Sequence, residues 1–368
     1  MADRINVLLE SSKQIMLDCC LENGAVVAAN TDKAYYPKRC QSYRFVWPTD
    51  AAFTLLALNE LGVRHVQEPY FKWLMSRVED VAADGLLFQN YYTHGTKRWI
   101  NFQPDSNGKT LWLIHDFFDG NVPKEWHHLM KLLSQALVRM WAGKFFGMKT
   151  QDRWEERSTY PDLEDNHTYS LAACVHGLRL AYKVLDDVKL RKVASEMLVC
   201  IDKAYQKCEQ ENKKSFRKNY FFRTAGKLSD STVDASVLGL VWPFEIVSAR
   251  DKRITDTVQV IEDNLVRDGG VMRYECDLYD GWTYHTEDRK KGAGTWPILT
   301  LFLCIYYARK GDMKKARKYY DWVVDKFNNC IPEQYYTNAI QEGVSPIAWN
   351  HAMFVFASKE LGLLPKDQ

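Results

Sequence analysis

The stretch WPILTLFLCIYY, residues 296–307, is apolar on nearly every side of the helix that it would form. A helix with apolar residues all round has to be surrounded by other protein, because exposing that surface to water costs free energy. Three more segments share this composition: DAAFTLLAL (50–58), YSLAACVHGL (169–178) and SVLGLVW (236–242). The pattern predicts a set of helices buried at the centre of the fold.

Helices of a second, amphipathic kind alternate with these apolar ones along the chain. Residues 187–210 are the clearest case, since Leu190, Val193, Met197 and Ile201 recur at spacings of three and four between charged residues. In all, the periodicity predicts about twelve helices, and strand-type alternation is nearly absent. The expected helices are 3–22, 49–61, 64–82, 109–119, 123–146, 167–185, 187–210, 231–247, 252–266, 295–310, 312–329 and 346–362.

The connections between these helices alternate as well. Those after the odd-numbered helices are long, roughly 16 to 29 residues, and the others have about one to five residues. All long loops then lie at one end of the molecule, with the apolar helices inside and the charged ones outside. We therefore expect an all-α fold, an (α/α)6 barrel of six helical hairpins, formed by residues 1–368 as a single domain. A superhelical array is the alternative, but no fixed-period repeat supports it.

The overall composition is that of an ordinary globular protein, with 46% hydrophobic residues, 26% charged residues and a formal net charge of +2. This balance gives no reason to expect nucleic-acid binding. No stretch reaches the roughly 18 uninterrupted apolar residues of a membrane span. The N-terminal MADRINVLLESSKQIM does not resemble a secretory signal. Nine cysteines without a CxxC pair are typical of reduced thiols, so we expect a cytoplasmic protein.

Carboxylates, aromatic side chains and an arginine gather in the long loops and at the first turns of the helices that follow them. Because these loops share one end of the expected barrel, the residues would meet at its mouth. The chain is also rich in aromatics, with 12 Trp and 20 Tyr, and rings beside carboxylates suit the apolar faces and hydroxyls of a sugar. The segments are WPTD (47–50), FQPDSNG (102–108), DRWEER (152–157), LSDSTVD (228–234), GGVMRYECD (269–277) and IPEQYY (331–336).

Two glutamates in these loops fit the chemistry of glycosidic-bond cleavage. The reaction needs one carboxylic acid to protonate the leaving oxygen, and a second carboxylate that acts on water or on the anomeric carbon. Glu155 lies between Trp154 and Glu156. Burial against an aromatic ring and a neighbouring negative charge both raise the pKa of a carboxyl group, as a general acid requires. Glu333, in the segment IPEQYY, is the candidate partner.

Several of these segments extend into longer motifs that follow one another in a fixed order. They are WPTDAAFTLLAL (47–58), DRWEER (152–157), MRYECD (272–277) with AGTWPILT (293–300), and IPEQYY (331–336) with SPIAWNHA (345–352). Together they resemble the signature segments of glycoside hydrolase family 15, which contains glucoamylases, glucodextranases, trehalases and isomaltose-cleaving enzymes. The resemblance covers nearly the whole chain. It implies an inverting, exo-acting α-glucosidase on an (α/α)6 barrel.

The resemblance also implies roles for individual residues. Glu155 would be the general acid, and Glu333 the general base that activates water. Asp50, Arg273 and Gln103 would contact the sugar. Alternatively, Asp50 could be an ordinary helix cap, Arg273 a core ion-pair residue and Gln103 part of a tight turn. Glu156 is expected to be a hydrogen-bonding neighbour rather than a second acid. The side chains that would bind the sugar or wall its pocket are Asp50, Trp47, Trp154, Glu156, Arg273, Trp296, Trp349 and Gln103.

One position departs from the family pattern. The family usually has arginine directly before the aspartate of the first motif, and this chain has Thr49. The departure leaves the substrate less certain than the type of reaction. We expect release of β-glucose from the non-reducing end of small α-linked gluco-oligosaccharides. A trehalase or other disaccharide hydrolase, and a non-hydrolytic sugar-binding relative, are the alternatives.

No metal, nucleotide or other cofactor is predicted. His127 and His128 are adjacent without metal-ligand spacing, and HExxH is absent. The sequence GAG (292–294) follows no predicted strand, so it is not a dinucleotide fingerprint. Asp230 and Asp234 are expected to cap the eighth helix rather than to reach the site. The expected partner is a small α-linked oligosaccharide or disaccharide, with no nucleic acid and no membrane; the oligomeric state is not indicated.

Overall fold

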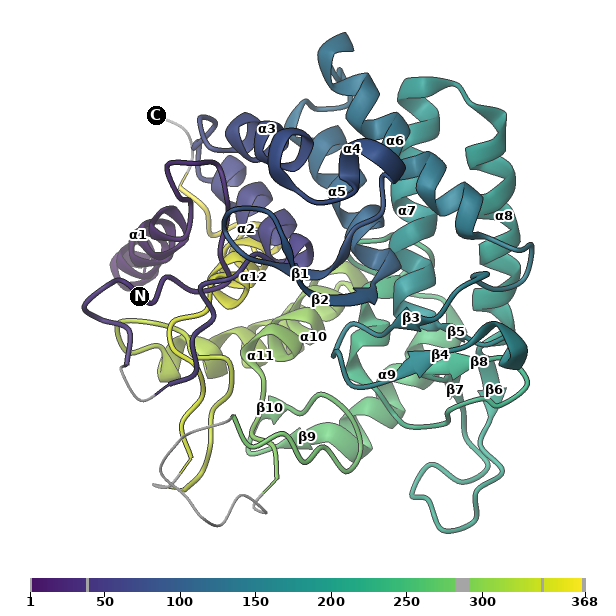
Figure 1. Cartoon of the computed structure of the whole chain (residues 1–368). Coiled ribbons are helices and arrows are strands. Elements are labelled where there is room, and N and C mark those ends of the chain that lie inside the picture. The colour runs from purple at the N-terminus through teal and green to yellow at the C-terminus, as the bar shows by residue number, and fades with distance from the viewer. Residues whose placement is uncertain (1, 38–39, 282–291, 339–340, 366–368) are drawn as a thin grey trace.

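The computed structural model of the protein describes residues 2–37, 40–281, 292–338 and 341–365, and helices make up most of its regular structure (Figure 1). The α-helices are α1 (Ala2–Asp18), α2 (Pro48–Glu60), α3 (Gln67–Arg77), α4 (Val81–Asp84), α5 (Pro104–Phe117), α6 (Lys124–Met140), α7 (Thr168–Leu185), α8 (Val188–Lys203), α9 (Lys252–Leu265), α10 (Pro297–Lys310), α11 (Met313–Lys326) and α12 (Ala348–Glu360). The 3-10 helices are η1 (Pro161–Leu163) and η2 (Ala235–Leu240).

Six elements form a closed inner ring. α2 contacts α5, α5 contacts α7, α7 contacts η2, η2 contacts α10, α10 contacts α12, and α12 returns to α2. The amphipathic helices α1, α3, α6, α8, α9 and α11 lie outside this ring. The connections into each inner element are the long ones, as the loop lengths predict. The fold is an (α/α)6 barrel, and this prediction is confirmed.

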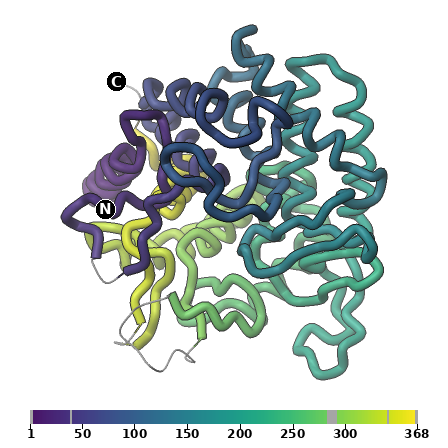
Figure 2. Tube along the Cα trace, viewed as in Figure 1, coloured from purple at the N-terminus to yellow at the C-terminus, as the bar shows by residue number. Residues whose placement is uncertain are grey.

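The ends of the chain complete the ring. The trace runs once round the barrel, so that α1, at its start, packs against α12, at its end (Figure 2). Ser12 and His351 are joined by a hydrogen bond of 3.0 Å between Oγ and Nδ1, and the Arg4 guanidinium donates to the carbonyl oxygen of Val324 at 2.9 Å. Within the described residues, no helix is long and apolar enough to cross a membrane.

The predicted helix over 231–247 is wrong. In its place the chain forms the six-residue 3-10 helix η2 and then turns at Trp242 and Pro243. Proline has no N–H to donate, and its ring clashes with the carbonyl four residues earlier, so an α-helix cannot run through Pro243 undisturbed. The barrel therefore has five α-helices and one short 3-10 helix in its inner ring.

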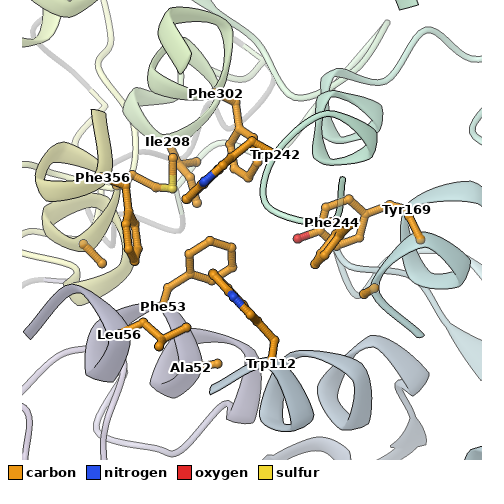
Figure 3. Close-up of a cluster of buried hydrophobic side chains, with 14 of the residues drawn as sticks. Ala52, Phe53, Leu56, Trp112, Tyr169, Trp242, Phe244, Ile298, Phe302 and Phe356 are labelled. Carbon is orange, nitrogen blue, oxygen red and sulfur yellow. The ribbon is translucent and has the colours of Figure 1, made fainter. Parts of the chain in front are cut away.

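Trp242 fills the space at the centre of the barrel. Its ring lies 5.0 Å from Phe356, 5.5 Å from Phe302 and 6.1 Å from Phe53, measured between ring centroids, and Trp112 is 6.3 Å away (Figure 3). These five rings come from α2, α5, the turn after η2, α10 and α12. An aromatic cluster of this size closes the barrel axis and gives any cavity at the loop end a solid base.

Two inner helices approach each other very closely. A Cβ atom added to Gly108 of α5 would lie 2.3 Å from the carbonyl oxygen of Ala173 in α7, and one added to Gly177 of α7 would lie 2.5 Å from the carbonyl oxygen of Gly108. Only glycine allows this approach at both positions.

The predicted start of the fourth helix, at residue 109, is wrong. The observed helix α5 begins at Pro104 and so includes Gly108.

The long loops contain short strands, although the sequence shows almost no alternation of apolar and polar residues. Each strand pairs with one antiparallel partner, β1 with β2, β3 with β4, β5 with β8, β6 with β7 and β9 with β10. The strands are β1 (Phe88–Tyr91), β2 (Lys97–Phe102), β3 (Thr150–Gln151), β4 (Ser158–Thr159), β5 (Asn166–His167), β6 (Tyr205–Lys207), β7 (Asn219–Phe221), β8 (Thr224–Ala225), β9 (Val266–Arg267) and β10 (Gly270–Val271). Most have two to four residues, too few for a period-two pattern to be read in the sequence.

Candidate active site

A cavity of about 410 Å³ opens at the long-loop end of the barrel. Its volume lies in the range of about 300 to 1,000 Å³ that is usual for small-molecule sites. Its walls contain four carboxylic acids, three arginines and several aromatic rings. The lining residues are Ala28, Gln41, Tyr43, Trp47, Thr49, Asp50, Arg98, Trp99, Arg153, Trp154, Glu155, Glu156, Arg273, Tyr279, Trp296, Glu333, Ile347 and Trp349.

Two inner helices present a tryptophan to this cavity in the same way. Trp47 is the N-cap residue of α2 and Trp296 that of α10, and proline is the first helical residue in both. Proline suits that position because the first N–H of a helix has no partner inside the helix, and its fixed φ angle prepares the turn. Each loop therefore ends, and each helix begins, with an aromatic ring at the wall of the cavity.

Glu155 lies at the tip of the hairpin formed by β3 and β4, residues 150–159, which we call the Glu155 hairpin. The Asp152 carboxylate accepts hydrogen bonds from the backbone N–H groups of Glu156 (2.9 Å) and Arg157 (3.0 Å). Glu155 itself has φ +64°, in the left-handed region that is rare for residues other than glycine. Backbone in that region persists where surrounding structure enforces it, and it clusters at functional sites.

Buried charges hold the hairpin from behind. Arg223 forms ion pairs with Asp152 and, at 3.4 Å, with Asp234. Asp234 also accepts a hydrogen bond of 2.9 Å from the indole N–H of Trp154. Burial alone would raise the pKa of Asp152, but the Arg223 guanidinium, His167 and the Arg157 N–H together outweigh burial, and the pKa lies below its usual range. Trp154, next to Glu155, is thereby fixed in the cavity wall.

The environment of Glu155 suits a proton donor. Its Oε1 accepts a hydrogen bond of 2.7 Å from the indole N–H of Trp47. Desolvation raises the pKa of Glu155 to about 8, and the negative charges of Asp50 and Asp152 add to the effect. Hydrogen bonds from Gln89 and Trp47 oppose this shift only in part. Glu155 is therefore protonated at neutral pH.

The environment of Glu333 is different. Its side chain is 4% exposed, and Tyr43 donates a hydrogen bond of 3.4 Å to its Oε1. Its Oε2 is buried without a hydrogen-bond partner among the described residues. Desolvation raises the pKa of Glu333 to about 7, but the Arg273 charge and hydrogen bonds from Tyr279 and Tyr43 lower it from the value that burial alone would give. Of the two glutamates, Glu333 loses its proton first.

The two glutamates are bridged by aromatic side chains. Trp47, which donates to Glu155, and Tyr43, which donates to Glu333, have ring centroids 5.5 Å apart. The hydroxyl of Tyr43 also lies 2.7 Å from that of Tyr279. Each carboxyl group thus binds a different aromatic donor on the same cavity wall, and one oxygen of Glu333 remains available.

Arg273 and Glu156 pair with each other at the cavity. The Arg273 guanidinium donates to Asp277 through two nitrogens and to Glu156 Oε1 at 2.7 Å. Glu156 also accepts a hydrogen bond from the Tyr274 hydroxyl. Arg273 is thus an ion-pair residue and a cavity residue at once, and Glu156 has the hydrogen-bonded surroundings expected of a neighbour rather than of a second acid.

Asp50 lies in the first turn of α2 at the cavity. Burial raises the pKa of Asp50 to about 6, and the positive charges of Lys109 and Arg153 limit the rise. The hydroxyl of Thr49, where the family usually has arginine, donates to Asp50 Oδ2 at 3.2 Å. Asp50 is the third residue of α2, and the N-cap residue of this helix is Trp47. Its carboxyl group therefore faces the cavity rather than serving as an ordinary cap.

Nine of the ten site residues predicted from the sequence line this cavity: Asp50, Trp47, Trp154, Glu155, Glu156, Arg273, Trp296, Glu333 and Trp349. The tenth, Gln103, does not. It is 1% exposed and is the N-cap residue of α5, and its side-chain amide donates to the Asp152 carbonyl oxygen at 2.9 Å. It supports the Glu155 hairpin from below and forms no tight turn, because the residues after it are helical.

Asp234 caps a helix as expected, whereas Asp230 does not. The Asp234 side chain caps η2 by accepting from the Ser236 N–H at 2.8 Å, in addition to its bond with Trp154. Asp230 accepts from the Thr232 N–H and lies outside the main cavity. No group of three or more His, Cys, Asp or Glu side chains in the described part of the chain is arranged to hold a metal ion.

Several cavity residues were not predicted. Tyr43 and Tyr279 come from loops, Arg98 and Trp99 come from strand β2, and no motif or local pattern distinguishes these four residues from their neighbours. Arg153 could have been found, because it stands inside the DRWEER segment directly before Trp154, which was assigned to the site. Trp154 forms part of the cavity wall, and Arg153 lines the same cavity.

The barrel and its acid-lined, aromatic cavity are those of a glycoside hydrolase. The chain belongs to glycoside hydrolase family 15: the family model described as "Glycosyl hydrolases family 15" matches residues 13–129 and 83–359. The resemblance drawn from the motifs is confirmed.

Two curated relatives cover most of the chain. An uncharacterized glycosyl hydrolase of Methanocaldococcus jannaschii is 28% identical over 376 residues, which are 96% of this chain and 55% of that protein. This chain thus spans about half the length of that relative. An isomaltose glucohydrolase of Kribbella flavida is 23% identical over 378 residues, 93% of this chain and 89% of the relative.

Solved structures share the fold. A glycosidase variant in complex with glucose has a TM-score of 0.78 at 21% identity, covering 99% of this chain and 98% of that one. A bacterial glucoamylase complexed with acarbose has a TM-score of 0.74 at 22% identity, covering 96% of this chain and 55% of that one. The glucoamylase of Saccharomycopsis fibuligera has a TM-score of 0.67 at 13% identity, with 97% and 95% covered.

Proposed function

We propose that the protein is an inverting, exo-acting α-glucoside hydrolase that releases β-glucose from the non-reducing end of small α-linked gluco-oligosaccharides. Glu155 is the general acid and Glu333 the general base. The observation that carries this proposal is the pair of glutamates on one cavity, with pKa values of about 8 and about 7. The order of the two values puts the proton on Glu155 and leaves Glu333 the stronger candidate to accept one.

The reaction then follows from the contacts of each carboxyl group. Glu155 gives its proton to the glycosidic oxygen as the bond from that oxygen to the anomeric carbon breaks. A water molecule forms the new bond to the anomeric carbon from the opposite face and gives its proton to Glu333, at the oxygen that has no hydrogen-bond partner among the described residues. Attack from the face opposite to the leaving group inverts the anomer. Solvent restores both protonation states afterwards.

Exo-action is supported by what lies beneath the cavity. Arg153, which lines it, lies 5.5 Å from the Phe302 ring centroid, and Phe302 packs on Trp242 in the aromatic core (Figure 3). A cavity with a solid base accepts the end of a sugar chain rather than its middle. Arg98 and the partly exposed Trp99, from the hairpin of β1 and β2, line the same cavity and offer a surface to the leaving sugar.

The substrate class is proposed from the relatives together with the cavity. A relative is named isomaltose glucohydrolase, and similar structures contain glucose or acarbose. Thr49 and Asp50 leave trehalose or another disaccharide as the second candidate, because the contact that arginine supplies in the family is made differently here. The nine cysteines are free, as is usual for thiols in the reducing cytoplasm that we propose as the location. We also propose that residues 1–368 act as one domain.

The decisive experiment follows the product by NMR. The protein is mixed with isomaltose, maltose or trehalose, and the anomeric protons of released glucose are recorded before mutarotation. The proposal expects β-glucose first from isomaltose or maltose. First appearance of α-glucose would refute inversion, and cleavage of trehalose alone would replace the substrate assignment while keeping the mechanism.

A further inference from the structure

Arg153 is a buried cation without a counter-ion. Its side chain is 7% exposed, and its Nη1 donates to the Tyr169 hydroxyl at 2.7 Å. Its Nε and Nη2 have no hydrogen-bond partner, and among the described residues no carboxylate forms an ion pair with it. Burial of a charge without compensation is costly, so two unused donors at this place call for an explanation.

Aromatic rings hold the Arg153 guanidinium in position. Its central carbon lies 4.8 Å from the Trp154 ring centroid, 4.7 Å from that of Tyr169 and 5.3 Å from that of Trp349. Cation–π contacts of this length stabilise the charge, but they leave the in-plane N–H donors free. Trp154 and Trp349 are themselves cavity walls, so the guanidinium is fixed between two surfaces of the site.

Asp50 is an acidic neighbour of Arg153 on the cavity wall. The positive charge of Arg153 lowers the pKa of Asp50 relative to the value that burial alone would give, yet the two groups form no ion pair. Thr49 occupies one Asp50 oxygen instead. Arg153 and Asp50 therefore both line the cavity, and their charges interact without an ion pair between them.

We propose that Arg153 binds hydroxyl groups of the non-reducing-end sugar ring, donating to one hydroxyl while Asp50 accepts from a neighbouring one. This inference rests on the proposed function and deepens it by naming a residue that selects the terminal sugar. The ring is the neutral glucose of the proposed function. Sugar hydroxyls then satisfy the guanidinium donors that the protein leaves unpaired.

The test is a variant measured against a set of deoxy substrates. Arg153→Met keeps an unbranched side chain against the same rings and removes the donors. With the disaccharide that the wild type cleaves, we expect kcat/KM to fall roughly 10- to 100-fold, the loss of a hydrogen bond to a charged group. Substrates that lack the hydroxyl at C2, C3, C4 or C6 of the terminal glucose are then compared. Removal of the hydroxyl that Arg153 binds should lower kcat/KM of the wild type. The same removal should lower kcat/KM of Arg153→Met only slightly, because this variant has already lost the hydrogen bond.

The same series separates sugar binding from a structural role. If Arg153 only supports the Glu155 hairpin, Arg153→Met lowers activity by the same factor with every deoxy substrate, and that result would overturn the proposal. If the wild type cleaves a glucuronide faster than the corresponding glucoside, the assignment of a neutral sugar ring is wrong. Arg153→Lys, with the same substrates, replaces Arg153→Met if the latter does not fold. Failure of the wild type to cleave any parent disaccharide would instead overturn the proposed function.

Discussion

The Glu155 hairpin and the loop that carries Glu333, residues 328–338, reach the same cavity but are held there differently. The hairpin depends on buried charges, with Arg223 between Asp152 and Asp234. The Glu333 loop depends on neutral groups: the side-chain amide of Asn350 donates to the Pro332 carbonyl oxygen at 2.6 Å. The Glu333 N–H donates to the Val344 carbonyl oxygen at 2.7 Å.

This difference bears on the chemistry of each carboxyl group. The negative charge of Asp152, which orders the hairpin, also raises the pKa of Glu155. Around Glu333 the supporting groups are neutral, and the charge of Arg273 and the tyrosine hydroxyls lower its pKa instead. Burial raises both pKa values, and the surroundings of Glu155 leave its pKa higher than that of Glu333.

The largest expected effect comes from the two glutamates themselves. Glu155→Gln and Glu333→Gln should each lower kcat by roughly 10² to 10⁴-fold on a disaccharide, as measured by glucose release. With α-glucosyl fluoride, whose leaving group needs little protonation, Glu155→Gln should recover much of the activity and Glu333→Gln should not. Glu164→Gln, at a glutamate that does not line the cavity, is the control. Equal recovery by both variants would break the assignment of acid and base.

Removal of the charged support should cost more stability than removal of the neutral one. Arg223→Met leaves Asp152 and Asp234 buried without their cation, so the free energy of unfolding should fall by about 3 to 5 kcal/mol. Asn350→Ala leaves the Pro332 carbonyl without its side-chain donor and should cost about 1 to 3 kcal/mol. Urea unfolding of both variants measures the difference. A larger loss in Asn350→Ala would show that the comparison between the two loops is mistaken.

The pH dependence should reflect the two pKa values. Below about 7 Glu333 is protonated and cannot accept a proton from water, and above about 8 Glu155 has lost the proton that it must give. A plot of kcat/KM against pH should therefore be a narrow bell, falling about tenfold per pH unit on each side. A profile that stays flat from pH 5 to pH 9, roughly, would contradict the assigned pair.

The smallest expected effects are shifts of the acid and alkaline limbs of the pH profile when Tyr43 or Trp47, the aromatic hydrogen-bond donors, is replaced. The Tyr43 hydrogen bond lowers the pKa of Glu333, so Tyr43→Phe should move the acid limb to higher pH. The Trp47 hydrogen bond lowers the pKa of Glu155, so Trp47→Phe should move the alkaline limb to higher pH. Each variant serves as the control for the other, because each should leave the other limb in place. Movement of both limbs in either variant would show that the two environments are not separate.

The sequence by itself determined the architecture and the end of the barrel at which the site lies. Apolar composition and loop length are local properties, and their alternation is enough to predict an inner and an outer ring with all long loops together. The motifs also led to both glutamates, which the structure places on one cavity. The helix over 231–247 was mistaken because the apolar pattern outweighed Pro243, and the two-residue strands were too short to be seen.

Only the tertiary structure decided what surrounds the site residues. Tyr43 and Glu333 are 290 positions apart in the chain, and Trp47 and Glu155 are 108 apart. No pattern near any of them specifies the pairing. The unpaired donors of Arg153 and the placement of Gln103 behind the hairpin likewise depend on distant elements. The physical reason is that periodicity records which face of a helix is buried, whereas desolvation and hydrogen-bond partners depend on which segments the closed ring brings together.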